Sequence, residues 1–258
     1  MDDGLMFLMQ KATDITESDL ARVFAFPATS APTVRATMVA SIDGAATIDG
    51  RSGILGGDGD QLVFHTMRRL ADAIVVGAKT AILEGYGPAK SDDDTPPPTL
   101  VLTSRSLDIP DDFTTAAAPN VLIATCASAP ADARERLTAA GATLVDCGTD
   151  DVDPAALVAE LASRGLNRID IEGGPRLLAS FAAAGVLDQL ILTVSPTLAL
   201  GDAPRIAHGA EVPLPDQELP LPFRLPRPMR ATTVLGDDDG FLYQLWETVR
   251  DGDATAGR

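Results

Sequence analysis

The stretch of residues 168–181 constrains the fold most, because it predicts a buried strand that turns directly into a helix. Two isoleucines alternate in it as they do on a strand, and Gly173 and Gly174 follow them. Pro175 suits the first turn of a helix, where its missing N–H leaves no hydrogen bond unmade. Free N–H groups at the start of a helix bind phosphate when a ligand can approach bare glycine backbone. A plain strand-to-helix turn without a ligand fits the same local pattern.

The rest of the chain alternates between strand and helix patterns. Buried strands are predicted at 34–42, 73–76, 99–102, 121–124, 142–145 and 189–194. Helices are predicted at 58–70, directly after Gly77, at 129–140 and at 154–164. This order indicates an α/β fold with a mainly parallel central sheet flanked by helices, and such sheets bind ligands at the carboxyl ends of their strands. Two last runs, 231–235 and 241–246, predict an antiparallel hairpin at the C-terminus.

A chain of this length and composition is expected to form one domain, which we place at residues 34–248. Residues 1–33 are interpreted as a lead-in segment whose role the sequence does not show. Residues 249–258 are predicted to be a disordered tail. The Asp- and Pro-rich segment 90–98 is expected to be exposed and mobile.

The bulk composition narrows the possible partners and the compartment. A formal net charge of −17 argues against a nucleic-acid or anionic-membrane partner, because their phosphates require a basic face. Cys126 and Cys147 form neither a disulfide framework nor a zinc site, and His65 and His208 stand alone, so no metal site is expected. The N-terminus lacks the basic region of a signal peptide, and no apolar run reaches the about 18 residues of a membrane span. We therefore expect a soluble, cytoplasmic protein.

Four motifs at strand ends point to one family. They are Ser41-Ile-Asp-Gly44, the run 72–80, the run 100–105 and the run 169–176. In order and spacing they resemble the reductase domain of riboflavin biosynthesis, a pyrimidine reductase with the dihydrofolate-reductase-like fold. The resemblance covers roughly residues 34–247.

The resemblance implies NADPH as the hydride donor. By this analogy three residues lie near the nicotinamide end of the cofactor: Gly77, Thr80 and Glu84. Three more would hold the adenosine 2′-phosphate, where an Arg fork gives charge-assisted, bidentate hydrogen bonds: Thr103, Ser104 and Arg105. The pyrophosphate would lie on a continuous run: Gly173, Gly174, Pro175, Arg176 and Leu177. A solvated turn is the alternative interpretation of the 103–105 motif, and the fold also implies a cis peptide between the two glycines.

On the substrate side, the resemblance points to the turn that contains Ser41, Asp43 and Gly44. Asp43 and Glu172 are the candidate catalytic residues, which would orient the substrate or deliver a proton as the hydride arrives. In the family's reaction, an imine formed from an opened ribosylamino sugar accepts the hydride and becomes a ribitylamino pyrimidine. Both acids also have a structural interpretation, since Asp before Gly is an ordinary turn residue and Glu172 could satisfy backbone donors.

The sequence departs from the family where a substrate phosphate would bind. Ala45 replaces the usual Lys or Arg, Gln61 stands where an Arg is common, and Glu84-Gly85-Tyr86 replaces the usual Asp-x-Pro. The possible basic replacements are Arg51, Lys79 and Lys90. The His-x-Glu and Pro-Cys-x-x-Cys motifs of the zinc deaminase domain found in fused members do not occur.

Three functions therefore stay open: a riboflavin-pathway pyrimidine reductase, a reductase of another small heterocycle such as a dihydropteridine, or a catalytically silent NADPH-binding protein. A homodimer is expected, because the family pairs its reductase domains and because the apolar region Leu190 to Leu200 exceeds what one edge strand should expose.

Overall fold

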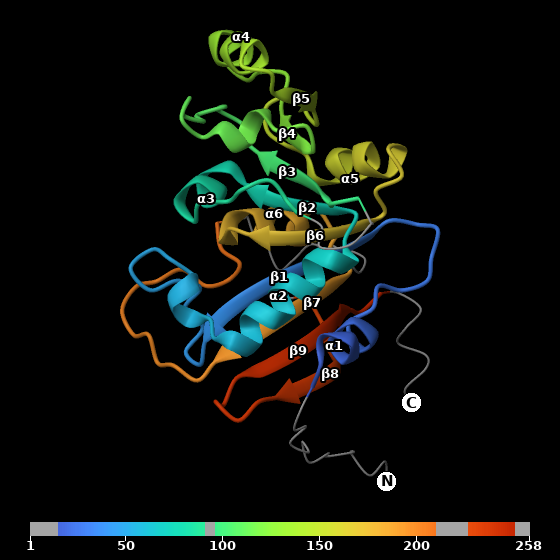
Figure 1. Cartoon of the computed structure of the whole chain (residues 1–258), viewed down its shortest axis with the longest axis vertical. Helices are drawn as coiled ribbons and strands as arrows, with labels where there is room; N and C mark the ends of the chain where they lie inside the picture. The colour runs from blue at the N-terminus through green and yellow to red at the C-terminus, as the bar shows by residue number, and fades with distance from the viewer. Residues whose placement is uncertain (1–14, 91–95, 210–226, 251–258) are drawn as a thin grey trace, which may run out of the picture.

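The computed structural model describes residues 15–90, 96–209 and 227–250. Its centre is a nine-stranded sheet with the strand order β5-β4-β3-β2-β6-β1-β7-β9-β8 (Figure 1). The strands are β1 Thr33–Ser41, β2 Ala73–Gly77, β3 Thr99–Thr103, β4 Val121–Thr125, β5 Thr143–Asp146, β6 Arg168–Gly173, β7 Gln189–Ser195, β8 Met229–Gly236 and β9 Leu242–Thr248.

The sheet is mainly parallel, as the alternating pattern predicted. Strands β1 to β7 pair parallel to their neighbours, and β9 pairs antiparallel to both β7 and β8. A turn at Asp237 joins β8 and β9, where the Asp237 carboxylate accepts the amide N–H of Phe241 at 2.9 Å. The α/β class and the C-terminal hairpin are therefore confirmed.

Helices cover both faces of the sheet. They are α1 Glu17–Val23, α2 Asp58–Leu70, α3 Ala78–Leu83, α4 Ala131–Ala139, α5 Pro154–Ser163 and α6 Pro175–Ala183. Successive strand residues point to opposite faces, so Ile74 packs with the side of the sheet that α3 and α4 cover, and Val75 with the side of α5 and α6. Helices α1 and α2 lie over β1, β7 and β9 (Figure 1).

Local sequence explains where these helices begin and end. In α5, Pro154 occupies the first turn, and the Asp153 side chain accepts the N–H groups of the next two residues. In α2, acidic residues occupy the first turn, and Arg68 and Arg69 occupy the last turn, so both ends complement the helix dipole. The predicted bounds of α2 agree with the structure.

The described part of the predicted lead-in segment contains a helix that the sequence analysis did not anticipate. A capping box between Thr16 and Asp19 begins α1. Leu20 and Phe24 are buried and pack with Met67 of α2. This part of the segment therefore belongs to the core. The predicted tail from residue 251 and the loop residues 91–95 lie outside the described residues, as does most of the proline-punctuated connection before β8.

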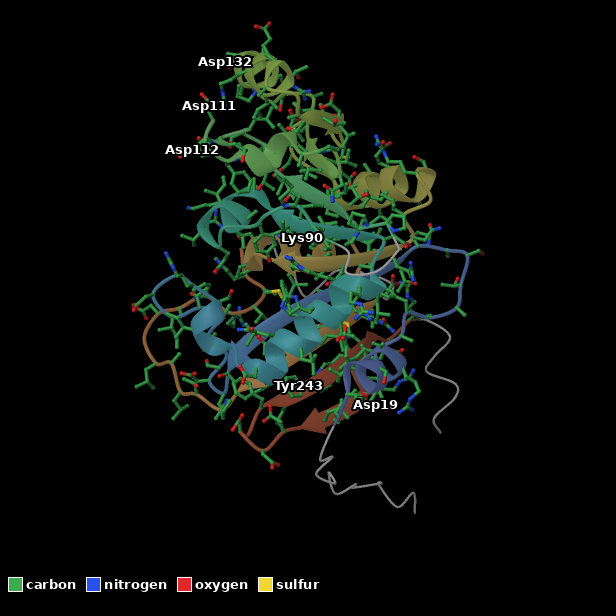
Figure 2. All side chains as sticks on the ribbon, viewed as in Figure 1. Asp19, Lys90, Asp111, Asp112, Asp132 and Tyr243 are labelled. Carbon is green, nitrogen blue, oxygen red and sulfur yellow. The ribbon has the colours of Figure 1, made fainter. Side chains whose placement is uncertain are left out.

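Acidic side chains are prominent on the surface. Asp111, Asp112 and Asp132 gather around α4, at one end of the molecule (Figure 2). Asp111 forms an exposed ion pair with Arg136. These acidic side chains contribute to the negative net charge at a part of the surface that water solvates.

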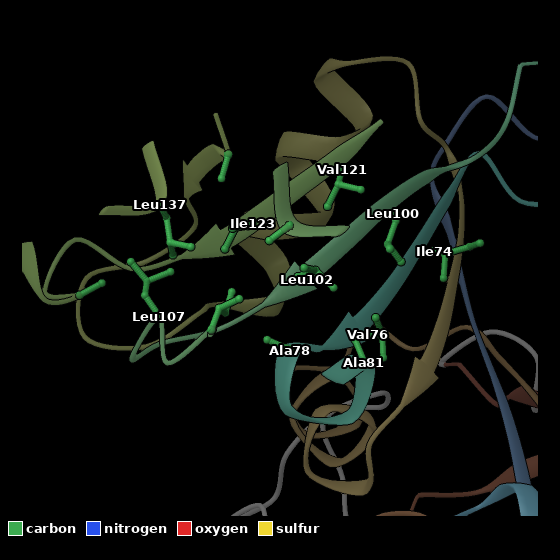
Figure 3. Packing of buried hydrophobic residues seen from close by; sticks show 14 of the residues in the cluster. Ile74, Val76, Ala78, Ala81, Leu100, Leu102, Leu107, Val121, Ile123 and Leu137 are labelled. Atoms are coloured by element: carbon green, nitrogen blue, oxygen red, sulfur yellow. The ribbon is translucent and has the colours of Figure 1, made fainter. Parts of the chain in front are cut away.

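One apolar cluster lies between the sheet and α3 and α4. Alternate residues of three parallel strands contribute to it, among them Ile74, Leu100 and Ile123, and Leu137 of α4 belongs to the same cluster (Figure 3). Burial of one such side chain contributes roughly 1.5–3 kcal/mol to folding. The two cysteines are free and buried, which agrees with their interpretation as small core residues.

The structure corrects the edge-strand argument for a dimer. Strand β7 lies between β1 and β9, so it is an interior strand. Two exposed apolar side chains belong to the loop that follows β7, Leu198 at 64% and Leu200 at 72% exposed. Ile42, in the loop after β1, is 62% exposed.

Candidate active site

The second half of β1 and the carboxyl end of β6 border a cavity of about 370 Å³. Its wall includes Thr37 and Met38 of β1, the loop from Ala46 to Gly56, and the beginning of α2. The opposite wall comes from α3 and from the turn between β6 and α6. Ligands bind at this edge in open parallel sheets, so the cavity is the candidate active site.

The turn between β6 and α6 forms one wall of the cavity from bare backbone. The peptide between Gly173 and Gly174 is cis, and Gly173 has a φ of 97°. A Cβ atom on Gly174 would lie 2.8 Å from Thr80 Oγ1 of α3, so a side chain there would require Thr80 to move. No side chain caps the start of α6, where Pro175 occupies the first turn. Together with Gly77, these predicted cofactor residues do lie side by side.

Glu172 is held at the bottom of the cavity by an arginine that the sequence analysis missed. The Arg68 Nε and Nη2 groups donate to Glu172 Oε1 and Oε2, both at 2.6 Å. The Glu172 side chain is only 1% exposed. Arg68 also lies over the rings of Phe64, at 4.3 Å, and Tyr86, at 4.8 Å. The pair is therefore bidentate, and its guanidinium also contacts two aromatic rings.

One signal in the sequence could have found Arg68. Phe64 and Arg68 stand four residues apart on α2 and so share one face of the helix. Tyr86 belongs to the segment in which the sequence departs from the family pattern. Burial, and next the Glu172 carboxylate, raise the pKa of Tyr86 well above its usual value, so its phenol stays neutral.

The predicted substrate turn makes hydrogen bonds within the protein and does not line the cavity. The Asp43 carboxylate accepts the Ser41 hydroxyl at 2.5 Å and the amide N–H groups of Ala199 and Leu200 at 3.0 and 2.9 Å. These bonds, with the Ser41 hydroxyl first, lower the pKa of Asp43 to about 2. Ser41, Asp43 and Gly44 do not line the cavity. Asp43 thus ties two loops together, and its geometry does not support the predicted delivery of a proton.

Glu84 lines the cavity and organises the loop above it. Glu84 Oε1 accepts the Ser52 amide N–H at 3.0 Å and the Ser52 hydroxyl at 3.2 Å. The same loop contains an isolated β-bridge between Ile48 and Arg51. The predicted cofactor residue therefore links α3 to this loop.

The motif predicted to bind the 2′-phosphate lies at the end of β3, next to β2. The Thr103 hydroxyl donates to the Val76 carbonyl at 3.4 Å, and Ser104 Oγ accepts the Leu107 N–H at 2.9 Å. The Arg105 side chain is 67% exposed and lies 3.8 Å from Asp151. An exposed pair of this kind is weak, so the guanidinium is available to an anionic ligand.

The end of the predicted pyrophosphate run lies at the surface. Arg176 is exposed and packs near Gly209, and Leu177 is partly buried against the cluster under α5 and α6. Neither residue lines the cavity. The glycine turn thus lines the cavity, whereas Arg176 lies outside its lining.

A second acid, which the sequence analysis did not single out, lies beneath Glu172. Asp170 is fully buried, and its Oδ1 atom accepts the Thr37 hydroxyl at 2.8 Å. Burial, and next the charge of Glu172, raise the pKa of Asp170 to about 7. Arg35, also fully buried, donates instead to Gln189 Oε1 at 2.6 and 3.0 Å. The alternation of Asp170 and Glu172 along β6 was the available signal, because it puts both on one face.

The cavity wall is acidic. Asp60, Glu84 and Glu172 line it, and no Lys, Arg or His belongs to its lining within the described ranges. Burial raises the pKa of Asp60. Three residues could replace the family's usual phosphate-binding residues, and none of them lines the cavity. Arg51, Lys79 and Lys90 are all exposed. Within the same ranges no cluster of His, Cys, Asp and Glu could hold a metal ion.

Residues 32–220 match a family model described as the RibD C-terminal domain. The chain belongs to this family. It is 30% identical over 190 residues to the riboflavin biosynthesis protein RibD of Bacillus amyloliquefaciens, covering 71% of this chain and 51% of that protein. The chain thus spans about half the length of this relative. It is 28% identical over 213 residues to a 2,5-diamino-6-ribosylamino-4(3H)-pyrimidinone 5′-phosphate reductase of Methanothermobacter thermautotrophicus, covering 76% and 93%.

The fold comparison agrees with this family. A pyrimidine reductase-like protein of Corynebacterium diphtheriae superposes with a TM-score of 0.76 at 25% identity, covering 92% of this chain and 100% of that one. The family and the fold implied by the sequence resemblance are confirmed. RibD-type domains are NAD(P)H-dependent reductases, so the chain belongs to an oxidoreductase family. None of the helices in the described ranges is long and apolar enough to cross a bilayer.

The site is chemically suited to a nicotinamide dinucleotide. The glycine turn offers bare backbone, and the uncapped start of α6 presents N–H groups of the kind that bind phosphate oxygens. Arg105 adds a guanidinium at the neighbouring strand end. The individual cofactor contacts stay predictions.

Proposed function

We propose that the protein is an NADPH-dependent reductase similar to 5-amino-6-(5-phosphoribosylamino)uracil reductase. The observation that supports this proposal is the composition of the cavity wall. The bare glycine turn before α6 and the Glu172 carboxylate, which Arg68 holds, both line it. A cofactor on the turn and a heterocycle against Glu172 would thus meet in one cavity.

The residues of the cavity would bind and orient a flat, donor-rich ring. Glu172 accepts hydrogen bonds and is fixed by two bonds from Arg68, so it can hold an amino group or a ring N–H in one position. Met38 and Phe64 supply apolar walls. When bound, NADPH supplies the hydride. The remaining requirement is a proton for the nitrogen of the reduced C=N bond.

A reductase of another small heterocycle is the second candidate, and the charge of the cavity favours it. A 5′-phosphate would enter a wall with three carboxylates and, among its described residues, no basic side chain. A phosphate without a cationic partner binds poorly. A neutral or cationic ring without a phosphate would be better suited to this wall.

The test is to mix the purified protein with NADPH and one substrate at a time, and to follow the loss of nicotinamide absorbance. The substrates are the phosphoribosylamino pyrimidine, its dephosphorylated form and a dihydropteridine. Turnover of the first alone supports the pyrimidine reductase, and turnover of an unphosphorylated ring supports the second candidate. NADPH binding by calorimetry without turnover of any substrate would identify a silent cofactor-binding protein instead.

A further inference from the structure

Asp170 has one carboxyl oxygen without a partner. Its Oδ1 atom accepts the Thr37 hydroxyl at 2.8 Å, whereas its Oδ2 atom is shielded from solvent and has no hydrogen-bond partner among the described residues. An ionised carboxylate in such a position would lose its hydration without replacement, which is costly. The neutral acid needs fewer partners, so burial favours a proton on Asp170.

Thr37 connects this buried acid to the cavity. Thr37 lines the cavity wall, whereas Asp170 does not. A threonine hydroxyl can donate one hydrogen bond and accept others at the same time. The parallel register pairs Arg35 of β1 with Asp170 of β6. Two residues further along both strands, Thr37 and Glu172 are therefore neighbours. Thr37 therefore contacts the buried carboxyl group and also borders the space predicted for the substrate.

Charged groups on three elements surround Asp170, and a fourth element contributes an apolar side chain. Glu172 on β6 raises its pKa, and Arg35 on β1 and Arg68 on α2 oppose this effect. Strand β2 contributes the apolar Ile74. Both arginines are engaged elsewhere, Arg35 with Gln189 and Arg68 with Glu172. The outcome is a carboxyl group that titrates near neutral pH, with its pKa raised to about 7.

We propose that Asp170 stores the proton used in the reduction and delivers it to the substrate through the Thr37 hydroxyl. This inference rests on the proposed reductase function. Hydride transfer from the reduced nicotinamide forms a C–H bond at the substrate carbon, breaks the C=N π bond and leaves the electron pair on nitrogen. In the protonated acid the proton lies on Oδ1, so Asp170 donates to the Thr37 oxygen across the same 2.8 Å contact and the Thr37 hydroxyl can donate to the substrate nitrogen. The nitrogen takes the Thr37 hydroxyl proton, and the Thr37 oxygen takes the proton of Asp170. Asp170 becomes a carboxylate, which solvent protonates again after the product leaves.

Turnover against pH tests the relay with two variants, Asp170→Asn and Thr37→Val. Asn keeps the shape of Asp but has no acidic proton, and Val keeps the shape of Thr but has no hydroxyl. Loss of a positioned proton donor lowers a rate by about 10²- to 10⁴-fold, so both variants should lose kcat in this range. The kcat of the unaltered protein should fall as pH rises through about 7, and this decrease should be absent in Asp170→Asn.

Three comparisons separate the relay from a merely structural role. Thr37→Ser keeps a hydroxyl and should recover most of the lost rate. Thr125→Val removes another buried hydroxyl, far from the cavity on β4, and should leave kcat unchanged. The affinity for NADPH should stay within about twofold in every variant, because a group that acts on the transition state affects the rate and not the binding of the cofactor. Wild-type turnover and an unchanged pH profile in Asp170→Asn would overturn the inference.

Infrared difference spectroscopy gives a readout that needs no substrate. The carbonyl stretch of a protonated carboxyl group should disappear as the pH rises through about 7, and Asp170→Asn should lack this band. If the unaltered protein reduces no substrate, the proposed function fails whatever the spectrum shows. If it is an active reductase and the band is absent or does not titrate, the inference about Asp170 fails while the proposed function stands.

Discussion

Arg68 is the residue on which the buried carboxylate of Glu172 depends. Both Glu172 oxygens accept hydrogen bonds from it, and the Glu172 side chain is almost inaccessible to water. Removal of one partner from such a pair leaves a charge that neither water nor protein compensates. The pair thus orients the carboxylate for ligands. Loss of either charged partner would leave the other buried without an opposite charge.

Arg68→Ala should therefore lower the free energy of unfolding by about 3 kcal/mol or more. Chemical denaturation measures this change. Arg164→Ala is the matched control, because it breaks an exposed i,i+4 pair with Glu160 and should cost about 0.3–0.5 kcal/mol. The double variant Arg68→Met with Glu172→Gln should recover much of the loss, since it leaves no buried charge. Equal stability of Arg68→Ala and the control would contradict this account.

The ionisation of Asp170 should also affect the free energy of unfolding. Its pKa is raised to about 7 in the folded protein, and an unfolded Asp titrates near about 3.9. Between these values the folded protein holds a proton that the unfolded chain has released, so this group lowers the free energy of unfolding as pH rises from about 4 to about 7.

Asp170→Asn should remove that titration. Urea denaturation at a series of pH values should show that the difference in stability, unaltered protein minus variant, falls with pH over this window, by at most about 1.4 kcal/mol per pH unit. Other carboxylates titrate equally in both proteins and cancel in the difference. Two curves that run parallel from pH 4 to pH 7 would show that Asp170 is ionised in the folded protein.

At the scale of single elements, β6 and α2 make the site. The alternation of side chains along β6 puts Asp170 and Glu172 on one face, and the strand ends in the glycine turn. The period of α2 puts Phe64 and Arg68 on the helix face toward them. A strand and a helix of ordinary geometry thus bring an acid pair, an arginine and a backbone turn to one edge of the sheet.

The end of β3 is predicted to decide which cofactor binds. Arg105→Ala should weaken NADPH binding by about ten- to a hundredfold and leave NADH almost unaffected, because a hydrogen bond to a charged group contributes about 1.5–3 kcal/mol and only NADPH has the 2′-phosphate. Calorimetric titration measures both affinities. Gly174→Val is the contrasting variant, since a side chain there meets Thr80 and should weaken both cofactors. Equal loss for both cofactors in Arg105→Ala would refute the 2′-phosphate assignment.

For the whole molecule, we propose that the exposed apolar residues Ile42, Leu198 and Leu200 form a contact between two copies of the chain. They belong to two loops that Asp43 ties together. Exposed apolar side chains that cluster in this way favour association, and the acidic surface elsewhere disfavours it by repulsion.

The double variant Leu198→Asp with Leu200→Asp should shift the protein from dimer to monomer in light scattering at micromolar concentration. Ile54→Asp is the control, because Ile54 is similarly exposed, at 55%, but belongs to the cavity loop. A monomer in the unaltered protein would exclude the proposed contact, and a dimer in the double variant would show that it lies elsewhere.

The sequence by itself determined the order of strands and helices, the parallel sheet, the C-terminal hairpin and the glycine turn before α6. These features follow from hydrophobic periods and from Gly and Pro positions, which act over a few residues. The motifs at the strand ends were sufficient to indicate the family.

Only the tertiary structure decided which side chains complete the site. Arg68 and Glu172 are 104 residues apart, and their contact depends on how α2 lies on β6. Asp43 turns to the backbone at Ala199 and Leu200, more than 150 residues away, so its own motif could not show that it leaves the cavity. Asp170 looks like any acid on a strand until the neighbouring strands and α2 bury it. Such contacts depend on strand register and loop packing, which no local stretch of sequence contains.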